Sequence, residues 1–136
     1  MELVTSYFGR QKELRKAGYK IVSVSRFNPR YCHIDVDLKI FAPRPDMINM
    51  EKGKYNVEFQ KILQKIDIDF VRSYLRDLEK RGYVKLALCC YEVDVNTCHR
   101  KQVGEYLAIK LMQEIQEFRP EPASKNPEVR QNDLFK

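Results

Sequence analysis

The sequence lacks a long hydrophobic segment, and we expect no secretory leader. No apolar run approaches the roughly 18 residues that a membrane-spanning helix needs. The first five residues contain neither the basic region nor the apolar stretch of a signal peptide. The four cysteines, Cys32, Cys89, Cys90 and Cys98, show no Cys-x-x-Cys spacing. We therefore expect a cytoplasmic protein with reduced thiols, and not a secreted protein, a membrane protein or a domain held by disulfides.

The common motifs of nucleotide-binding and hydrolytic enzymes are also absent. The sequence has no P-loop, no Gly-x-Gly-x-x-Gly, no His-Glu-x-x-His and no Gly-x-Ser-x-Gly. It lacks the cysteine phosphatase signature as well, because Arg100 follows Cys90 by ten positions and Cys98 by two. No single motif identifies a reaction, so function has to be inferred from where reactive residues fall in the fold.

The composition is typical of a folded domain. Of the 136 residues, 43% are hydrophobic and 32% are charged, which suits one hydrophobic core. We expect one domain over residues 1–118 and a flexible tail over residues 119–136, where three prolines occur among few apolar residues.

The net charge of +6 is concentrated near the N-terminus. Residues 10–30 contain seven basic residues and one acidic residue. A positive surface of this kind attracts nucleotides or nucleic acid. A solvated basic helix face is the alternative interpretation, and it fits the lysines best.

Hydrophobic patterns divide the chain into alternating strands and helices. Apolar and β-branched runs predict strands at 2–7, 19–25 and 83–91, with an outlying strand at 33–41. Helical spacing predicts helices at 9–16, 57–66, 69–82 and 98–117. The alternation predicts an α/β fold in which a small, mainly parallel sheet is flanked by helices in a single three-layer domain.

Reactive side chains gather directly after the strand at 83–91. In open parallel sheets, ligands bind beyond the carboxyl ends of the strands, where this segment lies. The candidate catalytic residues are Cys90, Glu92, Asp94, Cys98 and His99. With Asn96 or Thr97 as the N-cap, Cys98 falls in the first helical turn, where the helix dipole favours the thiolate. His99 can transfer protons near neutral pH, and the carboxylates can act as acid or base.

Three arginines are candidates for binding an anion. Arg100 opens the predicted helix beside free backbone N–H groups, and Arg26 and Arg30 follow the second strand. Parallel topology brings these strand ends to one edge of the sheet, so we expect the arginines to converge on a phosphate-containing ligand.

Structural roles explain the same residues without a ligand. Cys90 can be a small buried hydrophobe, Arg100 can pair with Glu92 or Asp94, and His99 can hydrogen-bond a neighbouring loop. The pairs Cys32-His33 and Cys98-His99 supply four potential zinc ligands, but adjacent ligands need a special backbone. The sequence therefore predicts neither a structural zinc site nor a cofactor.

One segment resembles a known family. The run from Leu86 to Arg100 resembles the signature of the family catalogued as domain of unknown function 488, in which an apolar strand precedes Cys-x-Glu-x-Asp and then Cys-His-Arg. The matching positions are Cys90, Glu92, Asp94, Cys98, His99 and Arg100, while Val95 replaces a frequent proline. Thr5-Ser6-Tyr7-Phe8 and Val22-Ser23-Val24-Ser25-Arg26-x-x-Pro29 are also similar to that family, so the resemblance covers residues 3–116. It implies a small α/β domain with a site over two strand ends, and no established reaction.

The tail carries a second resemblance. Gln131-Asn132-Asp133-Leu134-Phe135 resembles the pentapeptide that binds the bacterial sliding clamp, with Asn132 in place of the usual Leu. In that mode Leu134 and Phe135 would fill an apolar pocket and Gln131 would hydrogen-bond at its rim.

These features support an enzyme that acts on a nucleotide or a nucleic-acid component, with Cys98 or Cys90 as nucleophile. An alternative is a non-catalytic DNA-associated module that binds through residues 10–30 and is recruited by the tail. A third hypothesis is metal-dependent hydrolysis through Glu92 and Asp94.

Overall fold

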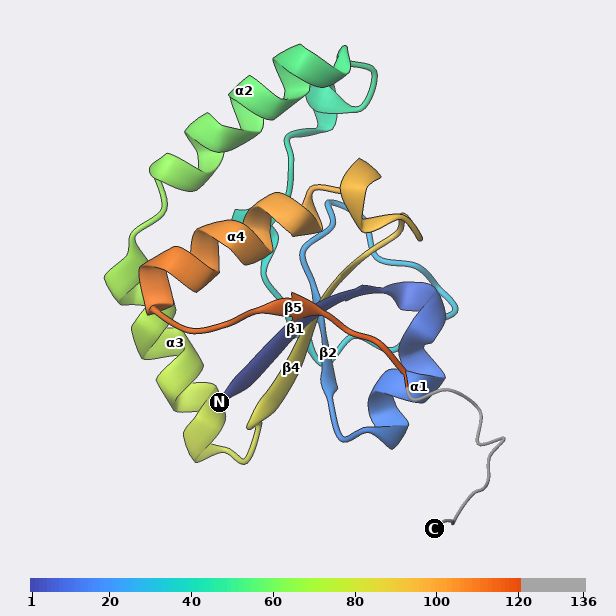
Figure 1. The fold of residues 1–136 in the computed structure, drawn as a ribbon, viewed down its shortest axis with the longest axis vertical. Coiled ribbons are helices and arrows are strands. Elements are labelled where there is room, and N and C mark those ends of the chain that lie inside the picture. Colours follow the sequence, from blue (N-terminus) through green and yellow to red (C-terminus); the bar gives the residue numbers. More distant parts are fainter. Residues whose placement is uncertain (121–136) are drawn as a thin grey trace, which may run out of the picture.

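Five parallel strands form the centre of the fold (Figure 1). The computed structural model describes residues 1–120. In spatial order the strands are β3-β2-β4-β1-β5. The strands are β1 (Glu2–Tyr7), β2 (Lys20–Ser23), β3 (Val36–Asp37), β4 (Lys85–Cys90) and β5 (Gln116–Glu117), and the helices are α1 (Gln11–Lys16), α2 (Lys52–Gln64), α3 (Ile68–Lys80) and α4 (Arg100–Leu111). The predicted α/β fold with a parallel sheet is confirmed.

Helices cover both faces of the sheet and complete three layers. On one face, Leu86 and Leu88 of β4 belong to a buried cluster that includes residues of α2, α3 and α4. On the opposite face, Ala87 and Cys89 pack in a smaller cluster with Leu14 of α1. Consecutive strand residues point to opposite faces. Cys89 and Cys90 therefore lie in different layers, as their adjacency in a strand predicts.

Local sequence explains where α1 and α3 end and where α3 begins. Gly18 and Gly82 have a φ of +92°, a left-handed conformation that glycine adopts without steric cost. They follow α1 and α3, as the sequence predicts. The start of α3 differs slightly, because Asp67 and not Asp69 is the N-cap, and its side chain accepts hydrogen bonds from the N–H groups of Asp69 and Phe70.

The C-terminal part of the fold differs from the prediction. The last helix was expected at 98–117, but α4 ends at Leu111 and Met112 takes a left-handed conformation. The chain then forms β5, which pairs in parallel with β1 at Thr5 and Glu117. The outlying strand expected at 33–41 is reduced to β3, since three-residue helical turns occupy much of the following segment.

None of the helices within residues 1–120 is long and apolar enough to cross a membrane. The division into a domain over 1–118 and a flexible tail stays a prediction, because most of the tail is outside the described residues.

Candidate functional site

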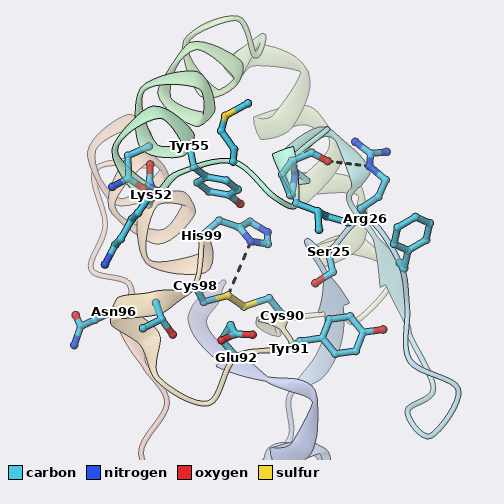
Figure 2. A pocket seen from close by; sticks show the side chains of 17 residues that line it. Ser25, Arg26, Lys52, Tyr55, Cys90, Tyr91, Glu92, Asn96, Cys98 and His99 are labelled. Carbon is cyan, nitrogen blue, oxygen red and sulfur yellow. Dashed lines mark hydrogen bonds between the residues drawn. A yellow bond between two sulfur atoms is a disulfide. The ribbon is translucent and has the colours of Figure 1, made fainter. Parts of the chain in front are cut away.

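A pocket of about 510 Å³ opens at the carboxyl ends of β2 and β4 (Figure 2). The loop after β2, the start of α2 and the segment between β4 and α4 form its walls. The residues that line it include Ser25, Arg26, Phe27, Lys52, Tyr55, Cys90, Tyr91, Glu92, Cys98 and His99. This is the edge of the sheet where parallel α/β proteins bind ligands.

The two pocket cysteines are bonded to each other. The sequence predicts reduced thiols, whereas the structure joins Cys90 and Cys98 by a disulfide. A short 3-10 helix at Val95–Thr97 brings this about, because it folds the chain back so that Cys98 meets the end of β4. The Cα atoms of the two cysteines are 7.2 Å apart, wider than the 4.4–6.8 Å usual for disulfides.

His99 lies against this sulfur pair in a defined orientation. Its Nε2 is 2.6 Å from the carbonyl oxygen of Val24, and its Nδ1 is 4.0 Å from the Cys98 sulfur. A carbonyl oxygen only accepts hydrogen bonds, so Nε2 carries the proton and Nδ1 presents a lone pair to the sulfur. The ring also packs edge-to-face against Phe59 of α2, with ring centroids 5.2 Å apart.

The environment keeps the His99 imidazole neutral. Burial lowers the pKa of His99 below its usual 6.5, an effect that the Val24 carbonyl partly opposes and the charge of Arg100 reinforces. A neutral imidazole at pH 7 can accept a proton from a neighbouring thiol.

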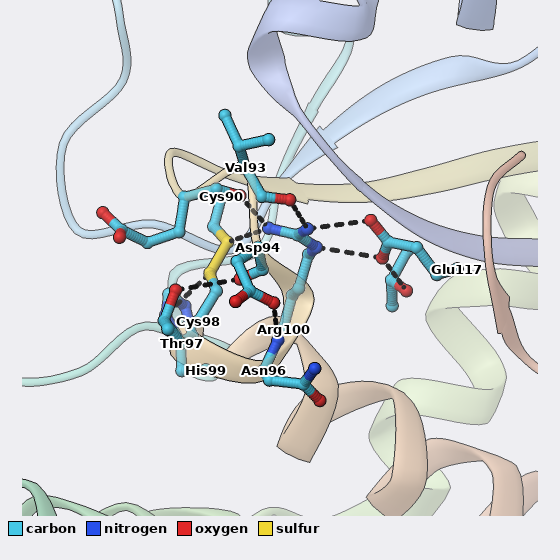
Figure 3. Close-up of polar contacts among 11 residues, drawn as sticks. Cys90, Val93, Asp94, Asn96, Thr97, Cys98, His99, Arg100 and Glu117 are labelled. Carbon is cyan, nitrogen blue, oxygen red and sulfur yellow. Dashed lines mark hydrogen bonds and ion pairs between the residues drawn. A yellow bond between two sulfur atoms is a disulfide. The ribbon is translucent and has the colours of Figure 1, made fainter.

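Arg100 lies behind the sulfurs and is fully buried (Figure 3). Its Nε and Nη2 donate to the two carboxylate oxygens of Glu117 at 3.0 and 2.8 Å. Nη2 also donates to the Val93 carbonyl at 3.0 Å, and Nη1 donates to the Glu92 carbonyl and to the Cys90 sulfur, the latter at 3.2 Å. One guanidinium thus ties the segment after β4 to β5.

This geometry corrects the anion-binding role expected of Arg100. All three guanidinium nitrogens donate to protein acceptors, and the Glu117 carboxylate balances the charge. The alternative interpretation, in which Arg100 pins the turn, fits better, although the carboxylate partner is Glu117 and not Glu92 or Asp94.

The segment before α4 also differs from the prediction. The helix begins at Arg100, so Cys98 precedes it in extended backbone and does not occupy the first turn. The N-cap is His99, without a side-chain cap bond, in place of Asn96 or Thr97. The helix dipole therefore does not act on Cys98 as the sequence predicts, and the imidazole of His99 is the neighbouring group.

The two carboxylates expected in the site are separated. Glu92 is exposed and lines the pocket. The Asp94 side chain instead accepts a hydrogen bond from the Asn96 N–H at 2.9 Å and caps the 3-10 helix, and Asp94 is not among the pocket residues. A metal held jointly by these carboxylates, as the third hypothesis requires, has no geometric basis here.

Of the arginines after β2, only one reaches the pocket. Arg26 lines it, and its Nε donates to the Pro43 carbonyl at 2.9 Å. Arg30 is exposed and is not a lining residue. The expected convergence of three arginines is therefore reduced to Arg26.

Sequence patterns missed several contributors to the site. Lys52 and Tyr55 come from the start of α2, and Figure 2 shows them on the opposite side of the pocket from Ser25 and Arg26, with His99 in between. Burial raises the pKa of Tyr55 to about 12, so its hydroxyl stays protonated and can donate. Glu117 was missed because its role depends on the placement of β5. No spacing in the sequence links these residues to the segment after β4.

The second Cys-His pair lies elsewhere. Cys32 packs with Cys89 on the face of the sheet covered by α1, whereas Cys98 belongs to the core of the opposite face. The structure therefore does not bring the four potential zinc ligands of the two pairs together.

The basic segment 10–30 is partly engaged in local contacts. Arg15 pairs with Asp35 at 2.8 Å, and Arg10 lies 3.9 Å from Glu13. The pentapeptide of Gln131, Leu134 and Phe135 is outside the described residues. The DNA-associated alternative gains no specific support from these contacts.

A comparison of the chain with models of protein families, with curated proteins and with solved structures finds no match. The resemblance to domain of unknown function 488 therefore stays a prediction.

Proposed function

We propose that the protein, in its reduced form, is an enzyme that acts on a nucleotide or another phosphate-bearing component of nucleic acid bound in the pocket. Cys98 is the nucleophile and His99 accepts its proton. The observation that carries this proposal is the orientation of His99, whose Nδ1 faces the Cys98 sulfur at 4.0 Å while Val24 holds its other nitrogen. Cysteine nucleophiles are activated by an imidazole oriented in this way.

Cys98 suits the role better than Cys90. Cys98 is 8% exposed and adjoins the imidazole, whereas Cys90 is 1% exposed and accepts a hydrogen bond from Arg100. A positive charge beside the Cys90 sulfur favours its ionised form, but that sulfur lies deeper. Cys90 is therefore a positioning residue next to the nucleophile.

Three features of the pocket support a nucleotide as the ligand. Arg26 and Lys52 line it and bring positive charge for a phosphate. The side chains of Phe27 and Tyr91, 61% and 45% exposed, offer flat apolar surfaces for a base. The volume of about 510 Å³ falls in the range of small-molecule sites.

The chemical step follows from the geometry. The Cys98 proton moves to His99 Nδ1, and the sulfur electron pair forms a bond to an electrophilic carbon of the bound molecule. The bond between that carbon and its leaving group breaks, and the imidazolium returns the proton to the leaving group. Water then attacks the same carbon: its oxygen forms the new bond, the carbon–sulfur bond breaks, and the electron pair of that bond stays on the Cys98 thiolate. The Glu92 carboxylate can accept the water's proton at the pocket edge, and solvent exchange returns a proton to Cys98.

Ligand binding by the reduced protein tests the substrate class. The probes are nucleoside monophosphates, the matching nucleosides and inorganic phosphate, measured by thermal shift and calorimetry. We expect a monophosphate to bind, and Arg26→Ala to weaken it about 10- to 100-fold, the equivalent of one charge-assisted hydrogen bond. Arg30→Ala is the matched control, because Arg30 is outside the pocket.

Alkylation by iodoacetamide tests the nucleophile. Peptide mapping of the reduced protein should place the fastest modification on Cys98, and the bound monophosphate should slow it. Equal binding to the Arg26→Ala and Arg30→Ala variants, or modification of Cys98 no faster than of Cys32, would overturn the proposal.

A further inference from the structure

Three potential metal ligands converge at the inner end of the pocket. The sulfurs of Cys90 and Cys98 and a ring nitrogen of His99 lie within 4.8 Å of one another. Within residues 1–120 this is the one cluster of three or more such ligand atoms, carboxylates included. Thiolate sulfur and imidazole nitrogen are the ligands that zinc prefers.

The hydrogen bond of His99 is the kind that supports metal ligation. Metal-binding histidines usually donate their second ring N–H to a carbonyl or carboxylate, which fixes the tautomer and aims the other nitrogen at the metal. The Val24 carbonyl, 2.6 Å from Nε2, fulfils this role and leaves Nδ1 directed at the sulfurs.

The spacing and charge around the cysteines also suit an ion. Two sulfurs that each lie 2.3 Å from one tetrahedral zinc are about 3.8 Å apart, so their backbones need more room than a disulfide allows. The Cα separation of 7.2 Å provides that room. Arg100 Nη1 donates to the Cys90 sulfur, as outer-sphere donors do, and Glu117 already balances its charge. Two thiolates can then neutralise a divalent ion.

We propose that the reduced protein binds one Zn²⁺ through the sulfurs of Cys90 and Cys98 and Nδ1 of His99, with the fourth position facing the pocket. Both thiols lose their protons when the ion binds, and the sulfur electron pairs form the metal bonds. Cys98 is then no longer free to attack a substrate. Zinc occupancy therefore switches off the thiol chemistry, a consequence that rests on the proposed function, whereas the zinc site itself does not.

Competition with a chromogenic zinc chelator tests the site. The full chain is reduced with a phosphine, which avoids added thiols, and zinc is titrated without oxygen. We expect one zinc per chain, confirmed by native mass spectrometry. Cys98→Ser, Cys90→Ser and His99→Ala should each weaken binding at least about 100-fold, since even outer-sphere partners contribute 10- to 100-fold. Cys89→Ser is the matched control, because Cys89 is the neighbour of Cys90 on the opposite face.

Cobalt binding gives a second test that uses only the wild-type protein, so a poorly folding variant does not affect it. Co²⁺ added to the wild-type protein should give a thiolate-to-cobalt charge-transfer band and the visible bands of tetrahedral coordination, and zinc should abolish both. A wild-type chain that binds no zinc, gives no thiolate band, or binds zinc as tightly after Cys98→Ser would overturn the proposal.

The zinc site and the proposed function can fail separately. Selective alkylation of Cys98 with no zinc binding would overturn the zinc site and leave the enzyme proposal intact. Zinc binding by a protein that no nucleotide stabilises would support the zinc site while the substrate class fails. If both proposals hold, one equivalent of zinc should protect Cys98 from iodoacetamide, and a chelator should restore its reactivity.

Discussion

The dipeptide Cys-His occurs twice in this chain, at 32–33 and 98–99, in two very different environments. The His99 ring is held between Val24, Phe59 and a sulfur pair that lines a pocket. The His33 side chain is 80% exposed, and its nearest charged partner is Asp35 at 3.6 Å. Cys32 is buried and its thiol donates to a backbone carbonyl. The same two residue types form a candidate site only at 98–99, where the end of β2, helix α2 and the buried Arg100 surround them.

An arginine lies near each Cys-His pair: Arg100 near Cys98-His99, and Arg15 near Cys32-His33. Removing the buried Arg100 should have the largest effect on stability. Arg100→Met leaves two carbonyls without their guanidinium donor and the Glu117 carboxylate without its counter-charge, with only the Thr5 hydroxyl still donating to it. We therefore expect the free energy of unfolding to fall by about 3 kcal/mol or more. Arg15→Met removes a pair with Asp35 near His33, where the arginine side chain is 35% exposed, and should cost about 1 kcal/mol or less. Urea denaturation measures both values.

A double-mutant cycle sharpens this contrast. Glu117→Gln in the Arg100→Met background should cost much less than in the wild type, because the carboxylate has already lost its guanidinium partner. Additive effects of the two substitutions would show that Arg100 and Glu117 do not act as a pair.

A smaller difference is expected between the two histidines. His99→Ala removes the hydrogen bond to Val24 and the contact with Phe59, which should lower the free energy of unfolding by about 1–3 kcal/mol. His33→Ala should change it by no more than about 0.5 kcal/mol, since the side chain is mostly solvated. Denaturation at pH 7 compares them, and equal losses would contradict the structural contrast.

The smallest effect concerns the rates of thiol labelling. Burial raises the pKa of the Cys32 thiol, with the charge of Arg15 partly opposing it. A raised pKa lowers the thiolate fraction at any given pH, so the labelling curve of Cys32 moves to higher pH. At pH 8 Cys98 in the reduced protein should react roughly an order of magnitude or more faster, because Cys32 also needs local opening. Mass spectrometry of timed iodoacetamide reactions measures the ratio.

Much of the fold could be predicted from the sequence. The alternation of apolar runs and helical spacing identified β1, β2, β4 and the helices, because each element buries a continuous face. The strand β5 was missed because its two residues, Gln116 and Glu117, carry no strand pattern. Ile115 and Phe118 fit a continued helix equally well, and only the left-handed turn at Met112 excludes it.

The candidate site was predictable where its residues are contiguous. Cys90, Cys98 and His99 come together because one short turn connects them, and their position after a central strand indicated a pocket. The sequence did not predict that Arg100 pairs with this carboxylate, because the carboxylate belongs to Glu117 on the separate strand β5. The contributions of Lys52 and Tyr55 depend on how α2 crosses the pocket, a tertiary property that no local pattern encodes.

The position of Glu117 has a consequence for the end of the chain. A protein shortened to residue 112 would retain every residue that lines the pocket. The buried guanidinium of Arg100 would nevertheless lose the carboxylate of Glu117 that balances its charge. The carboxylate that neutralises this cation lies only a few residues before the C-terminal tail. One guanidinium therefore connects the placement of β5 at the sheet edge to the sulfur of Cys90 at the pocket.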